Sequence, residues 1–239
     1  MPNKTTPISR RNFMRIAVAA VVTPSIVAGV PSSSRAAAKP APDPAVVLRD
    51  LMEGNARFKS GQTTAPRRQP SDFAGVAEGQ SPEAVILGCA DSRVPPEIVF
   101  DQGVGDLFVV RVAGNVVTGT GVIVKGSIEY AVAELNVPLI MVLGHSGCGA
   151  VKAALKHIEN SDPLPGAIRG LVDVIRPVAA RVKGLPGDPL ENAIRANVEA
   201  SVDRLKRLPP ILAPAVKNST LRVVGAVYDL RSGSVSHVI

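Results

Sequence analysis

Two short apolar runs of this chain are followed by residues that commonly bind metals. The run 84–87 precedes Cys89, and the run 139–143 precedes His145 and Cys148. No other cysteine occurs among the 239 residues. Apolar runs of about four to eight residues are typical of buried strands. Because ligands of open parallel sheets lie outside the carboxyl ends of the strands, the pattern predicts that these three side chains meet at one edge of a sheet.

Further apolar runs predict the remaining strands. One covers 107–112 and another covers 221–228, after which a turn at 231–233 leads into a short edge strand at 235–238. The core must be built from aliphatic side chains, since the chain has no tryptophan, two tyrosines and five phenylalanines. That composition suits a buried parallel sheet with helices on its faces.

Amphipathic patterns between these runs predict helices. The first is bounded by Asp43 as N-cap, Pro44 at the first helical position and Gly61 as the stop. Residues 62–82 are polar and contain prolines, so they are predicted to form a loop. The predicted helices cover 44–60, 121–135, 149–158, 166–183 and 189–207. Strands that alternate with helices predict an α/β fold with a mainly parallel β-sheet, about four strands plus an edge strand, flanked by helices.

The first 38 residues carry the pattern of an export signal. A twin-arginine segment at 9–15 is followed by a mostly apolar stretch at 16–30 and by an A-x-A cleavage site at 36–38. A disordered basic tail and a membrane anchor are the alternatives. The apolar stretch is too short, and too interrupted by Pro24, to span a bilayer. We therefore predict export by the twin-arginine route to a periplasmic or extracellular location, with no stable membrane insertion.

Removing this signal changes the charge argument. Residues 1–38 hold five basic residues and no acidic ones, so the formal net charge falls from +7 to +2. The basic pI is then no evidence for a nucleic-acid partner, and no cluster of aromatic and basic residues supports one. Residues 39–44 are predicted to be a Pro-rich linker. The remainder, 45–239, is long enough for a single α/β domain with a full core.

The two thiols and the imidazole form one of the ligand sets that hold zinc with a fourth position open. Cys148 would lie at the N-terminus of the following helix, where the helix dipole favours a thiolate. A disulfide is the alternative, because the predicted compartment is oxidising. A simple bridge, however, requires neither His145 at the H-x-x-C spacing nor the charged pair that follows Cys89. We therefore predict one zinc ion per chain.

Asp91 and Arg93 follow the first predicted ligand. Beside a metal, Asp91 could be the fourth ligand or could accept a hydrogen bond from metal-bound water. Arg93 can grip the carboxylate at two points and so select between these states. The alternative is a surface ion pair of little energetic consequence. The position directly after a strand that carries a ligand favours the functional interpretation. The other histidines, His157 and His237, could relay protons, but we predict that both are ordinary exposed residues.

Residues 89–93 (CADSR) and 145–149 (HSGCG) closely resemble the two signatures of the β-class carbonic anhydrases. The similarity extends over most of 45–160, in three further blocks at 53–58, 105–111 and 126–131. The resemblance implies an α/β fold around a mainly parallel four-stranded sheet. It also implies dimers that exchange N-terminal helices and often assemble into tetramers.

The resemblance also implies roles for individual residues. By motif position, the zinc ligands are Cys89, His145 and Cys148, and the catalytic dyad is Asp91 and Arg93. Three further residues fall where the family places its substrate pocket at the subunit interface. These are Gln80, Phe108 and Tyr130; without the resemblance, the sequence favours core positions for the last two over a pocket wall.

The implied reaction is the zinc-dependent, reversible hydration of carbon dioxide to bicarbonate and a proton, with zinc-bound hydroxide as the nucleophile and the Asp91–Arg93 dyad assisting. One alternative keeps the fold and the zinc but takes carbonyl sulfide or carbon disulfide as substrate. Another is a zinc-binding or disulfide-stabilised interaction module without catalysis, against which the intact dyad argues. A subgroup of the family binds regulatory bicarbonate through a tryptophan, which this chain lacks. The sequence leaves open water or Asp91 as fourth ligand, dimer or tetramer, and the identity of a proton shuttle.

Overall fold

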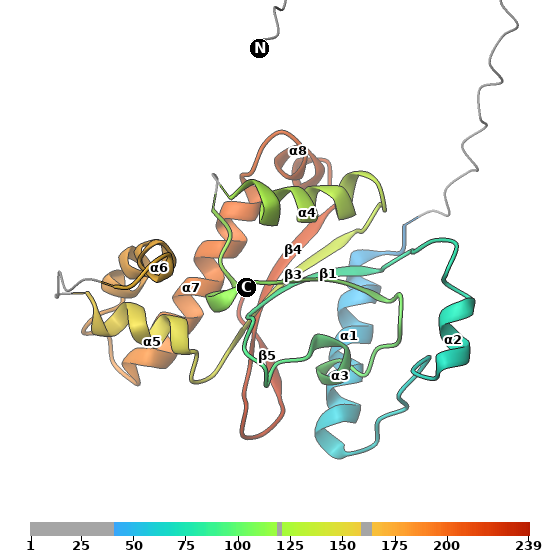
Figure 1. Ribbon diagram of the computed structural model, residues 1–239, viewed down its shortest axis with the longest axis horizontal. Helices are drawn as coiled ribbons and strands as arrows, with labels where there is room; N and C mark the ends of the chain where they lie inside the picture. Colours follow the sequence, from blue (N-terminus) through green and yellow to red (C-terminus); the bar gives the residue numbers. More distant parts are fainter. Residues whose placement is uncertain (1–40, 119–120, 159–163) are drawn as a thin grey trace, which may run out of the picture. The chain divides into compact units, whose positions relative to one another are not determined.

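Five strands form one mixed sheet in the computed structural model, which describes residues 41–118, 121–158 and 164–239 (Figure 1). The predicted signal at 1–38 and the first linker residues lie outside this part of the chain. The spatial order of the strands is β2-β1-β3-β4-β5. Neighbouring strands pair in parallel from β2 to β4, and β5 is antiparallel to β4. The predicted α/β fold is therefore confirmed. The strands are β1 (Ala84–Gly88), β2 (Leu107–Arg111), β3 (Leu139–His145), β4 (Arg222–Tyr228) and β5 (Val235–His237).

The two central strands are buried along their whole length. Every residue of β1 and β3 is buried, and nearly all are aliphatic. Such runs form strands because a parallel sheet covered on both faces offers apolar surroundings to every side chain. The edge strand β2 is only half-buried over its first four residues. The strand that the sequence extends to residue 112 ends at Arg111 in the structure.

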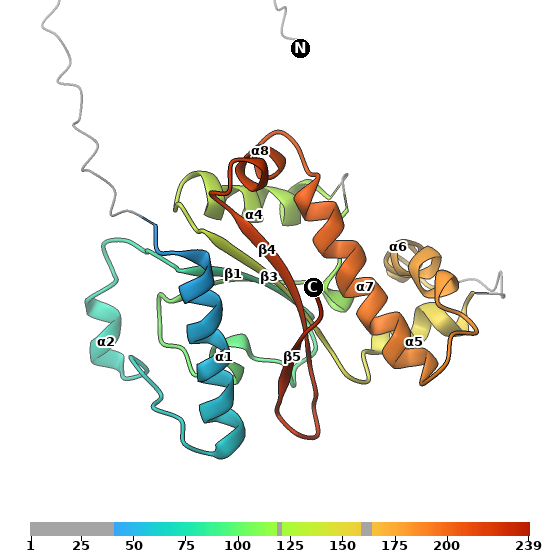
Figure 2. The ribbon, with the colours of Figure 1, turned by 180° about the vertical axis from the view of Figure 1, so that it is seen from behind.

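Helices cover both faces of the sheet (Figures 1 and 2). One face packs against α1 (Pro44–Ser60) and α3 (Pro96–Val99). The other face packs against a larger set: α4 (Val122–Ala133), α5 (Gly149–Lys156), α6 (Ile168–Arg181), α7 (Pro189–Lys206) and α8 (Leu212–Lys217). Within the described ranges, no helix is both long enough and apolar enough to cross a membrane.

The ends of α1 follow the predicted capping chemistry. The Asp43 carboxylate accepts a hydrogen bond from the Ala45 N–H at 2.7 Å, and Pro44 occupies the first turn. Gly61 ends the helix with φ +73°, a left-handed conformation that favours glycine. The loop predicted for 62–82 is wrong over five residues, where α2 (Pro70–Ala74) forms. Its first turn is held by Asp72, whose carboxylate accepts from the Gln69 N–H at 2.9 Å.

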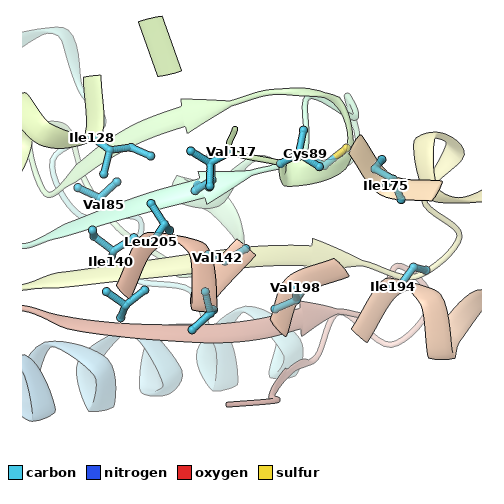
Figure 3. Close-up of a cluster of buried hydrophobic side chains, with 14 of the residues drawn as sticks. Val85, Cys89, Val117, Ile128, Ile140, Val142, Ile175, Ile194, Val198 and Leu205 are labelled. Carbon is cyan, nitrogen blue, oxygen red and sulfur yellow. The ribbon is translucent and has the colours of Figure 1, made fainter. Parts of the chain in front are cut away.

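Helix α7 packs directly against β3 and β4. A Cβ atom at Gly144 of β3 or at Gly225 of β4 would lie only 2.6 Å from a methyl group of Val198. Glycine at these two positions therefore lets α7 settle directly on the sheet. Figure 3 shows Ile194, Val198 and Leu205 of α7 facing the apolar side chains of the strands, with Cys89 at the margin of the same cluster.

The path of the chain opens a crevice at the carboxyl ends of β1 and β3. After β1 the chain passes to β2 on one side, whereas β3 lies on the other side of β1. Helix α3, which follows β1, packs on the face that carries α1. Helix α5, which follows β3, packs on the opposite face. Because the two connections leave toward opposite faces, this is the topological switch point at which open α/β sheets bind ligands.

Candidate metal centre

Cys89, His145 and Cys148 converge at this crevice. Their candidate donor atoms all lie within 4.8 Å of one another, and all three residues are buried. Gly88 pairs with Leu143 at the end of the ladder, so the adjacent strands bring Cys89 and His145 to within one residue of the same level. Both cysteines are free thiols, so the structure holds no bridge between them. Two sulfurs and one nitrogen therefore form one compact, buried cluster.

A tight turn after β3 places Cys148 at the beginning of α5. Gly147 adopts φ +68° in this turn, and Cys148 is the N-cap residue of the helix. The side chain of Cys89 and burial raise the pKa of Cys148, and the backbone N–H groups of Val151 and Ala150 at the start of α5 oppose this rise. The predicted helix-terminal position of Cys148 is confirmed.

His145 presents one ring nitrogen to the cluster. Its Nδ1 lies 3.0 Å from the Ser146 carbonyl oxygen, to which it donates when protonated. The end of β4 and the residues after it fix this turn through two hydrogen bonds of 2.9 Å. The Ser146 N–H donates to the Tyr228 carbonyl, and the Ser146 hydroxyl accepts from the Leu230 N–H. The other nitrogen, Nε2, is buried without a hydrogen-bond partner. A backbone carbonyl on one nitrogen and a vacant lone pair on the other is the usual arrangement of a metal-binding histidine.

The two thiols differ strongly in acidity. The pKa of Cys89 is lowered to about 4, chiefly because the Cys148 thiol donates a hydrogen bond to its sulfur. The pKa of Cys148 is raised for the same reason and by burial. Burial lowers the pKa of His145, but the negative charge of the nearby Cys89 sulfur and the Ser146 carbonyl raise the pKa more. Cys89 is thus the most acidic thiol of a buried cluster, where an ionised sulfur requires a positive partner.

The donor set fits zinc. Zinc accepts thiolate sulfur at about 2.3 Å and imidazole nitrogen at about 2.0–2.1 Å, commonly in tetrahedral geometry. Two sulfurs bound in this way lie roughly 3.8 Å apart. The donor atoms lie within 4.8 Å of one another, a span that one ion can bridge, and the unpartnered His145 Nε2 would gain a partner from a bound cation.

Asp91 and Arg93 form a bidentate pair beside the cluster. The Arg93 Nε donates to Asp91 Oδ1 at 2.9 Å, and Nη2 donates to Oδ2 at 2.7 Å. This pairing holds the pKa of Asp91 well below its usual range. Asp91 Oδ2 also lies 3.8 Å from His145 Nε2. The carboxylate therefore faces the cluster while Arg93 keeps it ionised.

Edge strand β2 holds the loop that carries both Cys89 and Asp91. The Arg111 side chain donates to the Cys89 carbonyl at 2.9 Å through Nε, and to the Asp91 carbonyl through Nη2. Backbone pairing continues past the end of the strand, because the Ala90 N–H donates to the Val112 carbonyl at 3.1 Å. A cavity of about 760 Å³ lies beside this loop and is bounded by Arg93, Ser146 and Tyr228 among others. The dyad therefore has access to solvent from a fixed loop.

Comparison with known proteins identifies the family. Residues 84–235 match the family model described as carbonic anhydrase. Carbonic anhydrase 2 of Mycobacterium tuberculosis is 44% identical over 197 residues, which cover 81% of this chain and 92% of that protein. A carbonic anhydrase of Mycolicibacterium smegmatis is 40% identical, over 82% of this chain and 94% of that protein. The chain belongs to the carbonic anhydrase family.

Solved structures agree on the β class of this carbonic anhydrase. Coccomyxa β-carbonic anhydrase superposes with a TM-score of 0.64 at 33% identity, covering 80% of this chain and 86% of that one. A β-carbonic anhydrase from Sordaria macrospora, described as tetrameric, also gives a TM-score of 0.64, at 27% identity over 81% of this chain and 94% of that one. The enzyme therefore has the β-class fold, and its family reaction is the hydration of carbon dioxide.

The three residues assigned to the substrate pocket lie apart from the cluster within one chain of the carbonic anhydrase. Gln80 is exposed in the segment between α2 and β1. Phe108 of β2 pairs with Val85, which is four residues, or about 13 Å of strand, before Cys89. Its ring contacts that of Tyr130 on α4, with centroids 6.3 Å apart. The structure thus brings Phe108 and Tyr130 together but joins neither of them, nor Gln80, to the metal cluster of the same chain.

Both remaining histidines lie outside the cluster. His237 is exposed on β5, as predicted. The prediction for His157 is wrong, because this residue is buried at the end of α5. It continues the stripe of Val151 and Ala154, at the three-residue spacing that places side chains on one helix face. The three-residue spacing of Val151, Ala154 and His157 could have predicted from the sequence that His157 is buried.

Proposed function

We propose that this carbonic anhydrase is a zinc enzyme in which Cys89, His145 and Cys148 bind one ion per chain and the Asp91–Arg93 dyad assists hydration of carbon dioxide. The observation that carries the proposal is the buried His145 Nε2, which has no hydrogen-bond partner and faces two free thiols. A structural disulfide would leave this nitrogen unpaired. A bound cation satisfies all three groups.

The dyad supplies a fixed hydrogen-bond acceptor. When bound, zinc supplies a Lewis acid that makes water a nucleophile near neutral pH. A water molecule between the cluster and Asp91 could donate a hydrogen bond to Oδ2, which would direct a lone pair of the water toward the carbon of the substrate. Arg93 holds both oxygens of the carboxylate and thereby keeps Asp91 from becoming a ligand itself. This arrangement supports the open state, with the fourth position left to water.

We further propose that a second copy of the chain completes the substrate pocket with Gln80, Phe108 and Tyr130. On α4, Val122 is 71% exposed, Ile123 is 79% exposed and Tyr130 is 48% exposed. Helix α4 contacts β2 through Tyr130 and Phe108, and the outer edge of β2 has no neighbouring strand in the described sheet. An exposed apolar helix face beside an open strand edge favours coverage by another protein surface. The tetrameric description of the Sordaria neighbour supports a symmetric assembly of this chain.

We expect the protein to be a dimer, or a tetramer built from dimers, at micromolar concentration. Burial of the α4 and β2 surfaces is the physical reason. Analytical ultracentrifugation measures the mass directly. The Ile123→Asp variant should shift the mass distribution toward monomer and lower the hydration rate. Ile168→Asp, at an exposed position of α6, serves as the control. A fully active monomer would contradict the shared pocket.

The zinc proposal is tested on the mature protein. We propose that the twin-arginine signal delivers a folded, metal-loaded enzyme, which protects both thiols from oxidation during export. Protein recovered from the periplasm should begin after residue 38, contain about one zinc per chain by mass spectrometry and catalyse hydration in a stopped-flow assay. Removal of zinc with a chelator should abolish the activity, and added zinc should restore it. A Cys89–Cys148 disulfide without zinc would rule out the proposed site.

A further inference from the structure

The Cys89 sulfur has a backbone hydrogen-bond donor outside the cluster. The Gly114 N–H donates to Cys89 Sγ at 3.3 Å, from a short 3-10 turn, η1 (Ala113–Asn115), that follows β2. Gly114 adopts φ +75°, a conformation that favours glycine. A Cβ atom there would also lie 2.8 Å from Ile175 Cδ1 and 3.2 Å from Ala150 Cβ. Both the backbone angle and the space around the turn therefore require glycine.

The same glycine is held from its other side by α7. Asn197 Nδ2 donates to the Gly114 carbonyl at 2.8 Å, across 83 residues of sequence. Asn197 is only 3% exposed and lies next to Val198, on the part of α7 that settles on the sheet. A buried amide in such surroundings is unfavourable unless it is hydrogen-bonded. The Asn197–Gly114 bond is therefore a firm contact between α7 and the turn that faces the sulfur.

We propose that Asn197 is a positioning residue that holds the Gly114 N–H against the Cys89 sulfur and so limits the electron donation of this thiolate to the metal. The inference rests on the proposed zinc site. A hydrogen bond to a thiolate stabilises its lone pairs and weakens it as a ligand, which leaves the bound cation a stronger Lewis acid. Without Asn197 the turn can rotate its N–H away from the sulfur, because the remaining backbone bond of the turn, from the Asn115 N–H to the Val112 carbonyl, does not fix Gly114.

A second side chain of α7 allows this role to be separated from general attachment of the segment. Arg204 lies seven residues after Asn197, on the same helix face, and its Nη1 donates to the Val117 carbonyl. Both residues fasten the segment 114–117 to α7, but only Asn197 contacts the residue that faces the sulfur. Loss of either should loosen the segment. Only loss of Asn197 should change the electronic state of the thiolate.

The test compares Asn197→Leu with Asn192→Leu in cobalt-substituted and zinc-loaded enzyme. Asn192 is on the same helix, and its Nδ2 also donates to a backbone carbonyl, that of Pro186 at 3.0 Å, on the exposed side. In Asn197→Leu, the thiolate-to-cobalt charge-transfer band should move to longer wavelength. The zinc-loaded variant should show kcat/KM lowered about tenfold at full zinc occupancy. Asn192→Leu should leave both unchanged, and Arg204→Met should leave the band unchanged while lowering the melting temperature.

Two results would overturn the inference. One is a wild-type charge-transfer band in folded, metal-loaded Asn197→Leu. The other is an equal shift in Arg204→Met, which would indicate general loosening rather than positioning. Wild-type enzyme loaded with cadmium-113 gives a test that does not depend on the folding of a variant. We expect scalar coupling between cadmium and the Gly114 amide proton through the Cys89 sulfur. Absence of this coupling would also overturn the inference. Failure of the wild type to bind any of the three metals would instead refute the proposed zinc site.

Discussion

The Asp91→Asn enzyme is expected to bind zinc like the wild type but to hydrate carbon dioxide about a hundredfold more slowly, or worse. The amide keeps the size of the side chain, so the cluster formed by the three ligands is preserved. It cannot present two anionic oxygens, however, and so it loses the bidentate pair with Arg93. An amide NH2 group can also turn toward the cluster, where it donates a hydrogen bond instead of accepting one.

The matched control is Asp173→Asn on α6. Asp173 also pairs with an arginine, Arg176, but lies on the surface of a helix far along the chain from the dyad. Its replacement should leave hydration unchanged, since exposed ion pairs contribute little. Stopped-flow rates and zinc content should be measured on both variants. Near-normal hydration by Asp91→Asn with full zinc content would show that the dyad is not part of the reaction.

The pH dependence of the two enzymes adds a second check. Because Arg93 holds the pKa of Asp91 below its usual range, the carboxylate is ionised throughout the range from about pH 5 to about pH 9. A depressed pKa means that protonation begins only when the pH falls below the ordinary value of about 4. Any rise of wild-type activity between about pH 6 and pH 9 therefore belongs to another group. Asp91→Asn should lower the rate across this range without removing the rise.

Local patterns were sufficient to predict the frame of the fold. The Asp43 and Gly61 caps, the apolar runs of β1 and β3 and the long helix α7 each follow from neighbouring residues in the sequence. Short elements escaped prediction because a helix of four to six residues, such as α3 or α8, is too short to show a period. Helix α2 arises from one side-chain cap at Asp72, within a segment whose prolines indicate a loop.

The candidate centre could be predicted from metal-binding residues that directly follow predicted strands. Cys89 and His145 each follow an apolar run, and the strand order brings these runs side by side. The residues that hold the centre in place could not be found in this way. Arg111 acts on backbone carbonyls 20 to 22 residues away, and Asn197 acts on Gly114 across 83 residues. Such contacts have no local signature, because any side chain with a donor can reach a carbonyl once the fold has formed.

Two of the residues proposed for the substrate pocket lie far from the metal cluster of their own chain. Phe108 and Tyr130 lie on the edge strand and on the exposed face of α4, away from the carboxyl ends of the strands. Residues placed in this way can join a cluster only across an interface between chains. The proposed metal site is therefore formed within one chain, whereas the proposed substrate pocket depends on the assembly. The assembly and the metal site can therefore be perturbed separately, the first by Ile123→Asp and the second by His145→Ala.

His145→Ala is expected to lose bound zinc and all hydration above the uncatalysed background. The imidazole is one of three proposed ligands, and its Nε2 has no other partner to satisfy. Its removal leaves two thiols in a buried cluster, where they are free to oxidise to a disulfide in the oxidising compartment that we propose for the protein. His237→Ala is the matched control, because that histidine is exposed on β5 and should leave zinc content and activity unchanged. Zinc content, free-thiol content and stopped-flow rates measured together separate loss of metal from loss of fold. Retention of one zinc per chain with wild-type hydration in His145→Ala would place the active metal elsewhere and end the proposal.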